Sequence, residues 1–392
     1  MMGERVGIEV SQAIAEAAML ADVDVVAAYP ITPQTHIVEH LAELVANGDL
    51  DAEYIPVESE HSAMSACLGA SAAGARTFTA TAGQGLELMH EVVYCVSAMR
   101  MPVVMAVANR ALSSPLSVWG DQSDLMSVRD TGWIQIVAKN GQEALDNVLC
   151  GFAIGEDHRV LLPVMVHVDG FFLTHVIEPV IMPDREEVAR FLPRYRHPLT
   201  LDPQAPVTMG AFAPPILYPE VKKAQDVHFR SIQPVILEYW ARFGEAFGRG
   251  YSPVESYRTE GAATLLVTMG SFTETASAAV DRMREQGKEI GLVQLRLWRP
   301  FPFEELRQAV KGAEILVVVD RAISFGGPGG PMASEIRSAL YGEDKRPRVI
   351  GFVAGLGGRD ISVEGFETMV MRGLEVAERG SEEEYETYGV RE

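Results

Sequence analysis

Short apolar runs alternate with segments of helical periodicity along residues 1–170. The apolar runs predict strands at 23–28, 54–57, 76–80, 102–108 and 163–168, and the segments between them predict helices at 8–21, 36–46, 63–73 and 86–99. The runs are apolar on both strand faces, which is typical of a parallel sheet covered by helices on both sides. The pattern therefore predicts a doubly wound α/β domain.

The same alternation returns after residue 260. It predicts strands at 264–269, 292–297, 315–320 and 348–353, and helices at 274–286, 332–341 and 366–376. The region between the two units is rich in proline, and it is too long for a structureless loop inside a compact chain. We therefore expect a domain over 1–170, an irregular arm of that domain over 171–259 with one or two helices around 220–247, a second domain over 260–380, and a frayed acidic tail over 381–392.

The charge balance changes which partners are plausible. Basic residues number 33 and acidic residues 54, so the formal net charge is −21. A chain with this balance is unsuited to neutralising phosphates, so we expect no nucleic-acid partner and no anionic membrane surface. An acidic electron carrier would also be repelled and should dock elsewhere. The chain has no apolar run of transmembrane length and no signal peptide, so we expect a cytoplasmic protein.

Cysteine and histidine spacing argues against a metal site. Cys67, Cys95 and Cys150 are far apart in the sequence, and there is no CxxC or HxH pattern. We therefore expect this chain to ligate no metal ion. The scattered cysteines fit a reducing compartment without disulfides.

Candidate chemistry is sought where strands end, because ligands of open parallel sheets bind at the carboxyl ends of the strands. Four segments are expected there: 29–35, 58–62, 79–85 and 109–124. The first has Tyr-Pro-Ile-Thr-Pro where a dinucleotide-binding domain would have Gly-x-Gly-x-x-Gly. A second glycine-rich segment, 326–330, is only a weak candidate for a phosphate site.

Three residues in these segments each have two interpretations. Thr32 stands between two prolines, and is either a fixed hydroxyl for a substrate oxygen or part of a stiff turn. Glu60 is either a carboxylate that acts on a cofactor nitrogen or a helix-dipole residue. Arg110 either binds a substrate carboxylate or pairs with Asp121 or Asp124. The residues alone leave these alternatives open.

A motif that is typical of enzymes dependent on thiamine diphosphate is absent from the sequence. Gly120-Asp121 is not followed by glycine, and Gly-Asp-Gly, the start of the usual diphosphate-binding motif of thiamine enzymes, occurs nowhere in the chain. A complete thiamine site within this single chain is therefore not expected.

Taken together, the segments resemble one family. Over about residues 5–378 the chain closely resembles the alpha subunit of the archaeal-type multisubunit pyruvate:ferredoxin oxidoreductases, which are members of the 2-oxoacid:ferredoxin oxidoreductase family. The resemblance rests on motifs in this order: Tyr29-Pro-Ile-Thr-Pro-Gln-Thr35, Val57-Glu-Ser-Glu-His-Ser62, Thr79-Ala-Thr-Ala-Gly-Gln-Gly85, Asn109-Arg110, Gly120-Asp-Gln-Ser-Asp124, Arg129-Asp-Thr-Gly-Trp133, Trp298-Arg-Pro-Phe-Pro302, Asp320-Arg321 with Ser324-Phe-Gly-Gly327, and Gly355-Leu-Gly-Gly-Arg-Asp360.

The resemblance implies half of a shared active site. It implies that the first domain binds the aminopyrimidine end of thiamine diphosphate and that the second is similar to the transketolase C-terminal domain. A beta subunit would hold the diphosphate, Mg²⁺ and the proximal [4Fe–4S] cluster. A ferredoxin-like delta subunit would carry further clusters, and a gamma subunit would complete the hetero-oligomer. Coenzyme A would be a co-substrate and ferredoxin the electron acceptor.

The resemblance also implies residue roles. Glu60 matches the glutamate that faces N1′ of the aminopyrimidine, and Thr32 and Arg110 match residues that contact the substrate carboxylate. Asp121 and Asp124 lie on the loop beside the substrate, where gating is one interpretation of their role. The remaining cofactor contacts would be Pro30, Ile31, Gly83 and Gln84.

The substrate implied is pyruvate. The sequence Asn-Arg-Ala-Leu-Ser-Ser-Pro-Leu at 109–116 differs from the pattern of 2-oxoglutarate-type subunits. The implied reaction is the reversible oxidative decarboxylation of pyruvate with coenzyme A to acetyl-CoA and CO₂, with electrons passing to ferredoxin. Alternatives are the same chemistry on a branched-chain, aromatic or oxalate substrate, a lipoamide- or decarboxylase-type thiamine enzyme subunit, or a non-enzymatic scaffold subunit.

Overall fold

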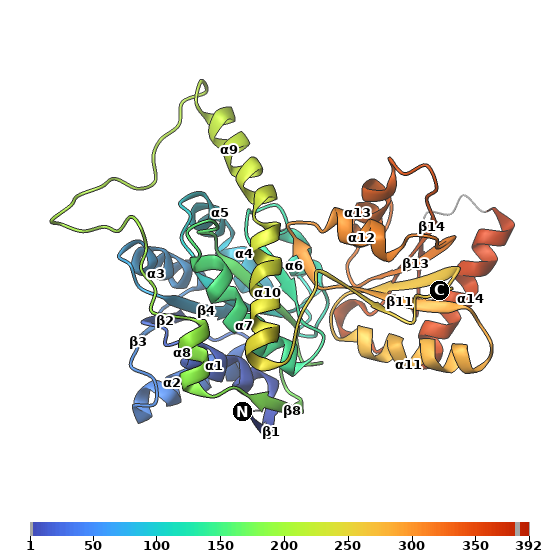
Figure 1. The fold of residues 1–392 in the computed structure, drawn as a ribbon, viewed down its shortest axis with the longest axis horizontal. Coiled ribbons are helices and arrows are strands. Elements are labelled where there is room, and N and C mark those ends of the chain that lie inside the picture. Colours follow the sequence, from blue (N-terminus) through green and yellow to red (C-terminus); the bar gives the residue numbers. More distant parts are fainter. Residues whose placement is uncertain (1–2, 381–384, 392) are drawn as a thin grey trace.

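Two α/β lobes lie side by side in the computed structural model, which describes residues 3–380 and 385–391 (Figure 1). Each lobe has a mainly parallel sheet between layers of helices, which confirms the predicted fold class. An arm projects from the first lobe, away from both sheets.

The first lobe contains a seven-stranded sheet in the order β12-β6-β7-β5-β4-β2-β3. All neighbouring strands are parallel except β12, which runs antiparallel to β6 at one edge. The strands are β2 (Val25–Ala28), β3 (Glu53–Pro56), β4 (Thr77–Thr81), β5 (Val104–Asn109), β6 (Ile134–Val137), β7 (Val164–Asp169) and β12 (Leu297–Arg299).

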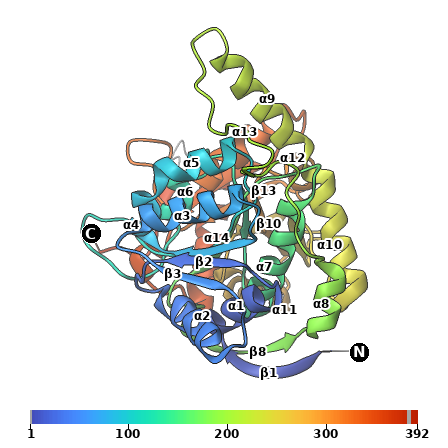
Figure 2. The same ribbon diagram turned by 90° about the vertical axis from the view of Figure 1, so that its left-hand side faces the viewer.

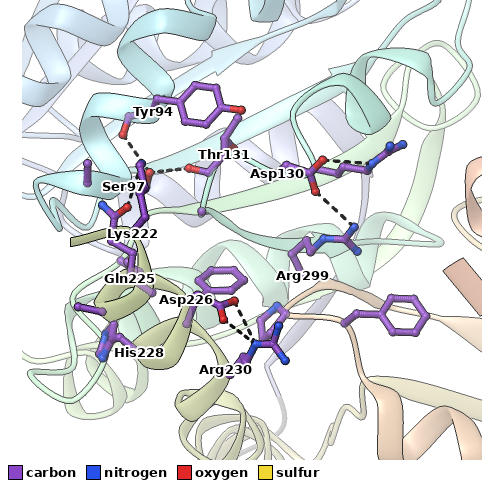
Figure 3. Close-up of a pocket in the computed structure, with 18 of the residues that line it drawn as sticks. Tyr94, Ser97, Asp130, Thr131, Lys222, Gln225, Asp226, His228, Arg230 and Arg299 are labelled. Atoms are coloured by element: carbon purple, nitrogen blue, oxygen red, sulfur yellow. Dashed lines mark hydrogen bonds and ion pairs between the residues drawn. The ribbon is translucent and has the colours of Figure 1, made fainter. Parts of the chain in front are cut away.

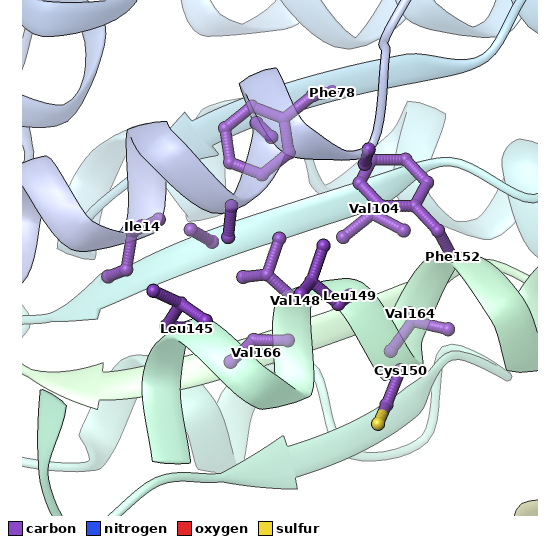
Figure 4. Close-up of a cluster of buried hydrophobic side chains, with 14 of the residues drawn as sticks. Ile14, Phe78, Val104, Leu145, Val148, Leu149, Cys150, Phe152, Val164 and Val166 are labelled. Carbon is purple, nitrogen blue, oxygen red and sulfur yellow. The ribbon is translucent and has the colours of Figure 1, made fainter. Parts of the chain in front are cut away.

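Helices cover both faces of this sheet. One face packs against α1 (Val10–Leu20), α2 (Thr35–Asn47) and α7 (Gly141–Glu156), and the other against α3 (Glu60–Ala72), α4 (Gly83–Leu88) and α5 (His90–Ala98). Figure 4 shows the apolar layer beneath α7, where Leu145, Leu149 and Phe152 contact strand residues that include Val104 and Val166. This packing holds the strand ends, and therefore the loops that follow them, in fixed positions.

The second lobe has a six-stranded sheet in the order β15-β14-β13-β10-β11-β9, parallel except at β9. Its strands are β9 (Val254–Tyr257), β10 (Thr264–Thr268), β11 (Ile290–Leu295), β13 (Ile315–Asp320), β14 (Arg348–Val353) and β15 (Tyr385–Thr387). One face packs against α11 (Phe272–Glu285) and α14 (Val363–Arg379). The other packs against α12 (Phe303–Ala309), α13 (Pro331–Leu340) and the first lobe's α6 (Ser123–Ser127).

The arm contains a strand, β8, and three helices, α8, α9 and α10. β8 (Ile177–Met182) pairs antiparallel with β1 (Glu4–Glu9), and α8 (Arg185–Phe191) follows. α10 (Gln233–Phe247) packs on the first lobe through Trp240, which donates to Asn147 at 3.1 Å. In contrast, α9 (Tyr218–Ser231) has no buried residue and projects outward with the loop before it, where Phe212 is 90% exposed (Figures 1 and 2).

Several elements differ from the sequence expectations. Residues 4–9 form a strand, whereas residues 8 and 9 were expected to begin the first helix, and the pattern did not predict β6 or α7. β9 lies within the expected arm but joins the second sheet, whereas β12 lies within the expected second domain but joins the first. Of the expected frayed tail, 381–384 and 392 lie outside the described residues, and 385–387 form β15 on the second sheet.

Candidate active site

The four segments singled out in the sequence meet at the carboxyl ends of β2, β3, β4 and β5. These strands are neighbours in the sheet, so the loops that follow them lie next to one another. Direct contacts join them: Arg110 donates to the Thr32 carbonyl at 3.1 Å, and Gln84 donates to Ser113 at 3.0 Å. The site therefore forms at the carboxyl ends of the strands, where parallel α/β domains bind ligands.

Glu60 is the first residue of α3 and is buried, with 5% of its surface exposed. Ser59 caps the helix by accepting from the Ser62 backbone N–H at 3.2 Å, so Glu60 is not needed as the cap. No hydrogen bond to the Glu60 carboxylate is found among residues 3–380 and 385–391. A buried carboxylate at the mouth of a site, without a partner of its own, is suited to binding a ligand group that carries a proton.

Arg110 follows β5 and lies beside Glu60. Its Nη1 donates to the Thr32 carbonyl, and its Nε donates to the Ser117 carbonyl at 3.0 Å. Burial lowers the pKa of the Arg110 guanidinium, and the charges of Asp124 and Glu60 oppose this shift. The guanidinium retains donors beyond those two bonds, because an arginine carries five N–H groups.

Thr32 contributes its backbone to this cluster. Its carbonyl accepts from Arg110, whereas the residue as a whole is exposed at the surface. The adjoining Thr32–Pro33 peptide is cis. Ile31, in the same loop, donates its backbone N–H to Gln34 Oε1 at 3.2 Å, and Pro30 before it is exposed.

Asp124 lies beneath the site and is completely buried. Its Oδ2 accepts from the backbone N–H groups of Gly83 and Arg110, both at 2.9 Å, and its Oδ1 accepts from Asn109 Nδ2 and from the Leu125 N–H, both at 2.8 Å. Burial raises the pKa of Asp124 to about 7 despite these bonds. Asp124 thus bonds to the backbone of Arg110, not to its guanidinium.

Asp121 faces the second lobe instead. Its Oδ2 accepts from the Gly357 N–H at 3.0 Å, and its Oδ1 accepts from Ser123. No hydrogen bond or ion pair joins it to Arg110 within the described residues. The two aspartates of this loop therefore have different surroundings.

Two glycines of the site lie in close contact with neighbouring side chains. Gly83 has a φ of +46°, and a Cβ there would lie 3.1 Å from side-chain carbons of Arg110. A Cβ at Gly85 would lie 2.5 Å from Glu60 Oε1 and 2.6 Å from Thr81 Oγ1. Thr81 Oγ1 and Gln84 Oε1 are buried without a partner in the described part of the chain. The partnerless polar atoms near the Glu60 carboxylate are consistent with a polar ligand.

Gln34 is a site residue that the sequence did not reveal. It is fully buried, its Nε2 donates to the Ala80 carbonyl at 2.6 Å, and its Oε1 accepts from Ile31. It therefore fastens the 29–33 loop to β4. Its position two residues after Thr32 in a recognised motif was the only available signal.

A cavity of about 810 Å³ lies at the amino ends of the strands of the first sheet, opposite the cluster around Glu60 (Figure 3). It is lined by residues that precede β5 and β6, by α9 and by Arg299 of β12. Its charges are largely paired, for example Asp226 with Arg230 at 3.0 Å and Asp130 with Arg299 at 3.8 Å. The motifs at 129–133 and 298–302 therefore contribute to this cavity rather than to the cluster around Glu60.

Neither a metal-ligand cluster nor a membrane-spanning helix is found in the described residues. Across residues 3–380 and 385–391, no three His, Cys, Asp or Glu side chains are grouped so that they could hold a metal ion. Cys67 and Cys150 are buried and Cys95 is exposed, all as free thiols. No helix in the described part of the chain is both long and apolar enough to cross a bilayer.

Family models match most of the chain. The model for pyruvate flavodoxin/ferredoxin oxidoreductase, thiamine diphosphate-binding, matches residues 16–240, and the model for pyruvate:ferredoxin oxidoreductase core domain II matches residues 262–366. The first match corresponds to the first lobe and the second match to the second lobe. The exception is β12, which lies within the second match but belongs to the first sheet.

The fold is similar to two solved structures. One is a 2-oxoglutarate:ferredoxin oxidoreductase from Magnetococcus marinus, with a TM-score of 0.70 and 19% identity over 95% of this chain and 65% of that chain. The other is a split-gene transketolase, with a TM-score of 0.56 and 14% identity over 94% of this chain and 99% of that chain.

Curated relatives are similar over nearly their whole length. Pyruvate synthase subunit PorA of Methanothermobacter thermautotrophicus is 49% identical over 93% of this chain and 94% of its own. In Pyrococcus horikoshii, PorA is 47% identical over 97% of this chain and 96% of its own, and ketoisovalerate oxidoreductase subunit VorA is 44% identical over 96% and 95%. With both family models matched and relatives this similar, the chain belongs to the pyruvate:ferredoxin oxidoreductase family.

Proposed function

We propose that this chain is the alpha subunit of a multisubunit pyruvate:ferredoxin oxidoreductase. The reaction is the reversible oxidative decarboxylation of pyruvate with coenzyme A to acetyl-CoA and CO₂, with electrons passing to ferredoxin. The observation that carries the proposal is that Glu60, a buried carboxylate without a hydrogen-bond partner in the described residues, lies near the guanidinium of Arg110 at the carboxyl ends of the strands. Family membership and the PorA relatives support it.

The residues present fit the aminopyrimidine half of thiamine diphosphate. A protonated ring nitrogen needs an acceptor such as Glu60, and an exocyclic amine needs further acceptors such as the partnerless Gln84 Oε1. Gly85 lets the backbone of α4 lie against the Glu60 carboxylate, and Gly83 lies against the Arg110 side chain. We assign Pro30, Ile31 and Gly83 to the remaining cofactor contacts. When bound, the cofactor supplies the electron sink for the loss of CO₂.

Each residue then has a defined task. Glu60 holds or shares a proton with the nitrogen that it faces. Arg110 binds the carboxylate of the 2-oxoacid and orients it for departure, with Thr32 assisting at the same oxygen atoms. Asp121 and Asp124 belong to the adjoining loop, and their contacts support a positioning role better than a gating role, because both are tied to neighbouring backbone.

The remaining groups are assigned to partner subunits. We place Mg²⁺ and the diphosphate on a beta subunit, together with the proximal [4Fe–4S] cluster, and further clusters on a ferredoxin-like delta subunit, with a gamma subunit completing the complex. The missing Gly-Asp-Gly sequence supports this division of the site. We place the assembly in the cytoplasm, with no nucleic-acid or membrane partner.

Pyruvate is the favoured substrate, and a branched-chain 2-oxoacid is the second candidate. The second candidate has specific support, because the two Pyrococcus horikoshii relatives are almost equally similar to this chain. PorA is 47% identical to it and VorA 44%. Comparing kcat/KM for pyruvate and 2-ketoisovalerate in the purified complex decides between them. A higher value for ketoisovalerate would overturn the pyruvate assignment.

The reaction class is tested with Glu60→Gln in the whole complex. Coenzyme A-dependent reduction of ferredoxin or viologen by pyruvate is expected to fall by at least about a hundredfold, as is usual when a proton-transfer group is removed. The control is Glu58→Gln, because Glu58 is exposed and bonds only to Ser62 among the described residues. Near-normal turnover of the Glu60 variant would refute its role, and a wild-type complex that reduced no viologen would favour a lipoamide- or decarboxylase-type enzyme.

A further inference from the structure

Residues 120–124, here called the bridging segment, contact the second lobe with their first three members. The Gly120 carbonyl accepts from Arg321 Nη2 at 3.0 Å, and the Gln122 N–H donates to the Arg321 carbonyl at 2.9 Å. Gln122 Nε2 also donates to the Met269 carbonyl at 3.1 Å, and Asp121 accepts from Gly357. These partners follow β13, β10 and β14, three adjacent strands of the second sheet.

The last two members of the bridging segment contact the site. Ser123 Oγ accepts from the Leu112 N–H at 3.0 Å, just after Arg110. Asp124 Oδ2 accepts from Gly83 and Arg110, as described above. One carboxylate oxygen therefore joins the loop that carries the cofactor-side glycine to the loop that carries the substrate-side arginine.

Arg321 is itself held firmly. Its guanidinium is buried, lies 2.5 Å from Asp169 Oδ1 at the end of β7, and stacks 3.9 Å from the ring centre of Phe272. Asp169 Oδ2 in turn accepts from the Ser271 N–H and hydroxyl, both at 2.6 Å. A buried arginine with these partners has little freedom to move, so the first half of the bridging segment is fixed to both lobes.

We propose that Asp124 and Arg321 are positioning residues, through which the second lobe holds Arg110 and Gly83 in place for the 2-oxoacid and the cofactor. This inference rests on the proposed function, in which Arg110 binds the substrate carboxylate. It gives the second lobe a role in the reaction although that lobe contributes no residue to the cluster around Glu60.

The hydrogen bonds of the Asp124 carboxyl group explain why a substitution there affects Arg110. Its two oxygen atoms accept four N–H donors, which is the full capacity of a carboxylate. An asparagine has one acceptor oxygen and two donor hydrogens, so Asp124→Asn must break bonds to one side. With the amide nitrogen at the Oδ2 position, the backbone N–H groups of Gly83 and Arg110 lose their common acceptor. With the nitrogen at the Oδ1 position, it faces the donors of Asn109 and Leu125 and is pushed away from them, which displaces the bonds to Gly83 and Arg110.

The test uses steady-state kinetics of the assembled complex. Asp124→Asn and Arg321→Met are expected to raise KM for the 2-oxoacid by about tenfold or more, which corresponds to the loss of one good hydrogen bond to a charged group. KM for coenzyme A should stay within about twofold. The matched control is Arg282→Met, which breaks exposed ion pairs with Glu364 and Glu367 on the same lobe, away from the bridging segment.

Amide hydrogen exchange gives a readout that does not depend on turnover. In Asp124→Asn and Arg321→Met, peptides that contain the Gly83 and Arg110 amides should exchange faster, and in Arg282→Met they should not. Arg321→Lys keeps the charge beside Asp169 and is expected to fall between wild type and Arg321→Met. If Arg321→Met did not assemble, Asp121→Asn, which weakens the bond to Gly357, would test the same connection.

The outcomes are separable from the proposed function. Unchanged exchange at Gly83 and Arg110 in both variants would overturn the positioning role, whatever the substrate. Equal rises in KM for the 2-oxoacid and coenzyme A would overturn it as well, since that result indicates general loosening. An inactive wild-type complex, or an active Glu60→Gln complex, would count against the proposed function and leave the exchange result standing.

Discussion

Gly85 and Glu60 lie so close together that no side chain fits between them: a Cβ at residue 85 would come within 2.5 Å of Glu60 Oε1 and 2.9 Å of its carboxyl carbon. Contacts this short are not tolerated, so either the carboxylate or the start of α4 would have to move. The glycine therefore matters because it lets the carboxylate keep its position beside the start of α4.

Gly85→Ala is expected to reduce turnover of the complex by at least about tenfold while leaving the fold intact, since a displacement near 1 Å at a reacting group has effects of this size or larger. The measurement is turnover together with the affinity for thiamine diphosphate. Gly69→Ala is the matched control, because no atom lies within 4 Å of a Cβ at that position of α3. Equal activity of the two variants would show that the position of the Glu60 carboxylate beside Gly85 is not needed for turnover.

Gln34→Ala should loosen the loop that carries Thr32. The substitution leaves the Ala80 carbonyl and the Ile31 N–H without their partner, at a cost of about 1–3 kcal/mol for each buried group that stays unpaired. We expect weaker binding of the 2-oxoacid, seen as a higher KM, because the Thr32 carbonyl also accepts from Arg110. Gln34→Glu retains one acceptor and tests whether the amide donor is essential.

Arg76 and Glu156 form a buried, two-pronged ion pair with distances of 2.6 and 2.7 Å between β4 and α7. Arg76→Met should lower the free energy of unfolding by about 3–5 kcal/mol, because it leaves a carboxylate buried without its partner. The midpoint of urea unfolding measures this change. Arg185→Met, at an exposed pair 3.8 Å from Asp22, should change stability by less than about 0.5 kcal/mol.

Asp320 gives the second lobe a predictable response to pH. It accepts from the N–H groups of Met332 and Ala333 and is fully buried, which raises its pKa to about 7. A carboxyl whose pKa is higher when folded binds more protons in the folded state, so its contribution to stability is lost as pH rises from about 4 to about 7. Comparing wild type with Asp320→Asn by denaturation at several pH values should reveal a slope that is smaller in the variant by up to about 1.4 kcal/mol per pH unit.

The apolar runs predicted the central strands because β4, β5 and β7 are buried on both faces, and no other element produces that pattern as readily. The sequence pattern places the last two residues of β1, Ile8 and Glu9, in a helix because they continue into the periodicity of α1. The pattern does not reveal α7, because its polar residues Glu143, Asp146 and Asn147 are buried with the apolar ones and do not mark a solvent face.

The candidate residues were found largely through ordered motifs, and their partners were not. Glu60, Arg110 and Asp124 stand in recognisable sequences, but the bond from Arg110 to the Thr32 carbonyl joins residues 78 positions apart. The contact between Arg321 and Gly120 spans 201 positions. Such contacts depend on how two sheets pack together, and spacing along one chain does not encode that arrangement.

The exchange of β12 limits how this protein can be divided. Cutting the chain near residue 260 would separate the two domains that the sequence suggests. Leu297–Arg299, which form β12 of the first sheet, would then remain in the carboxyl-terminal fragment. β6 would then become an open sheet edge, with unpaired backbone groups able to pair with another chain. An amino-terminal fragment made in this way should self-associate, and a swap of the second domain between relatives should succeed only if those three residues travel with the recipient sheet.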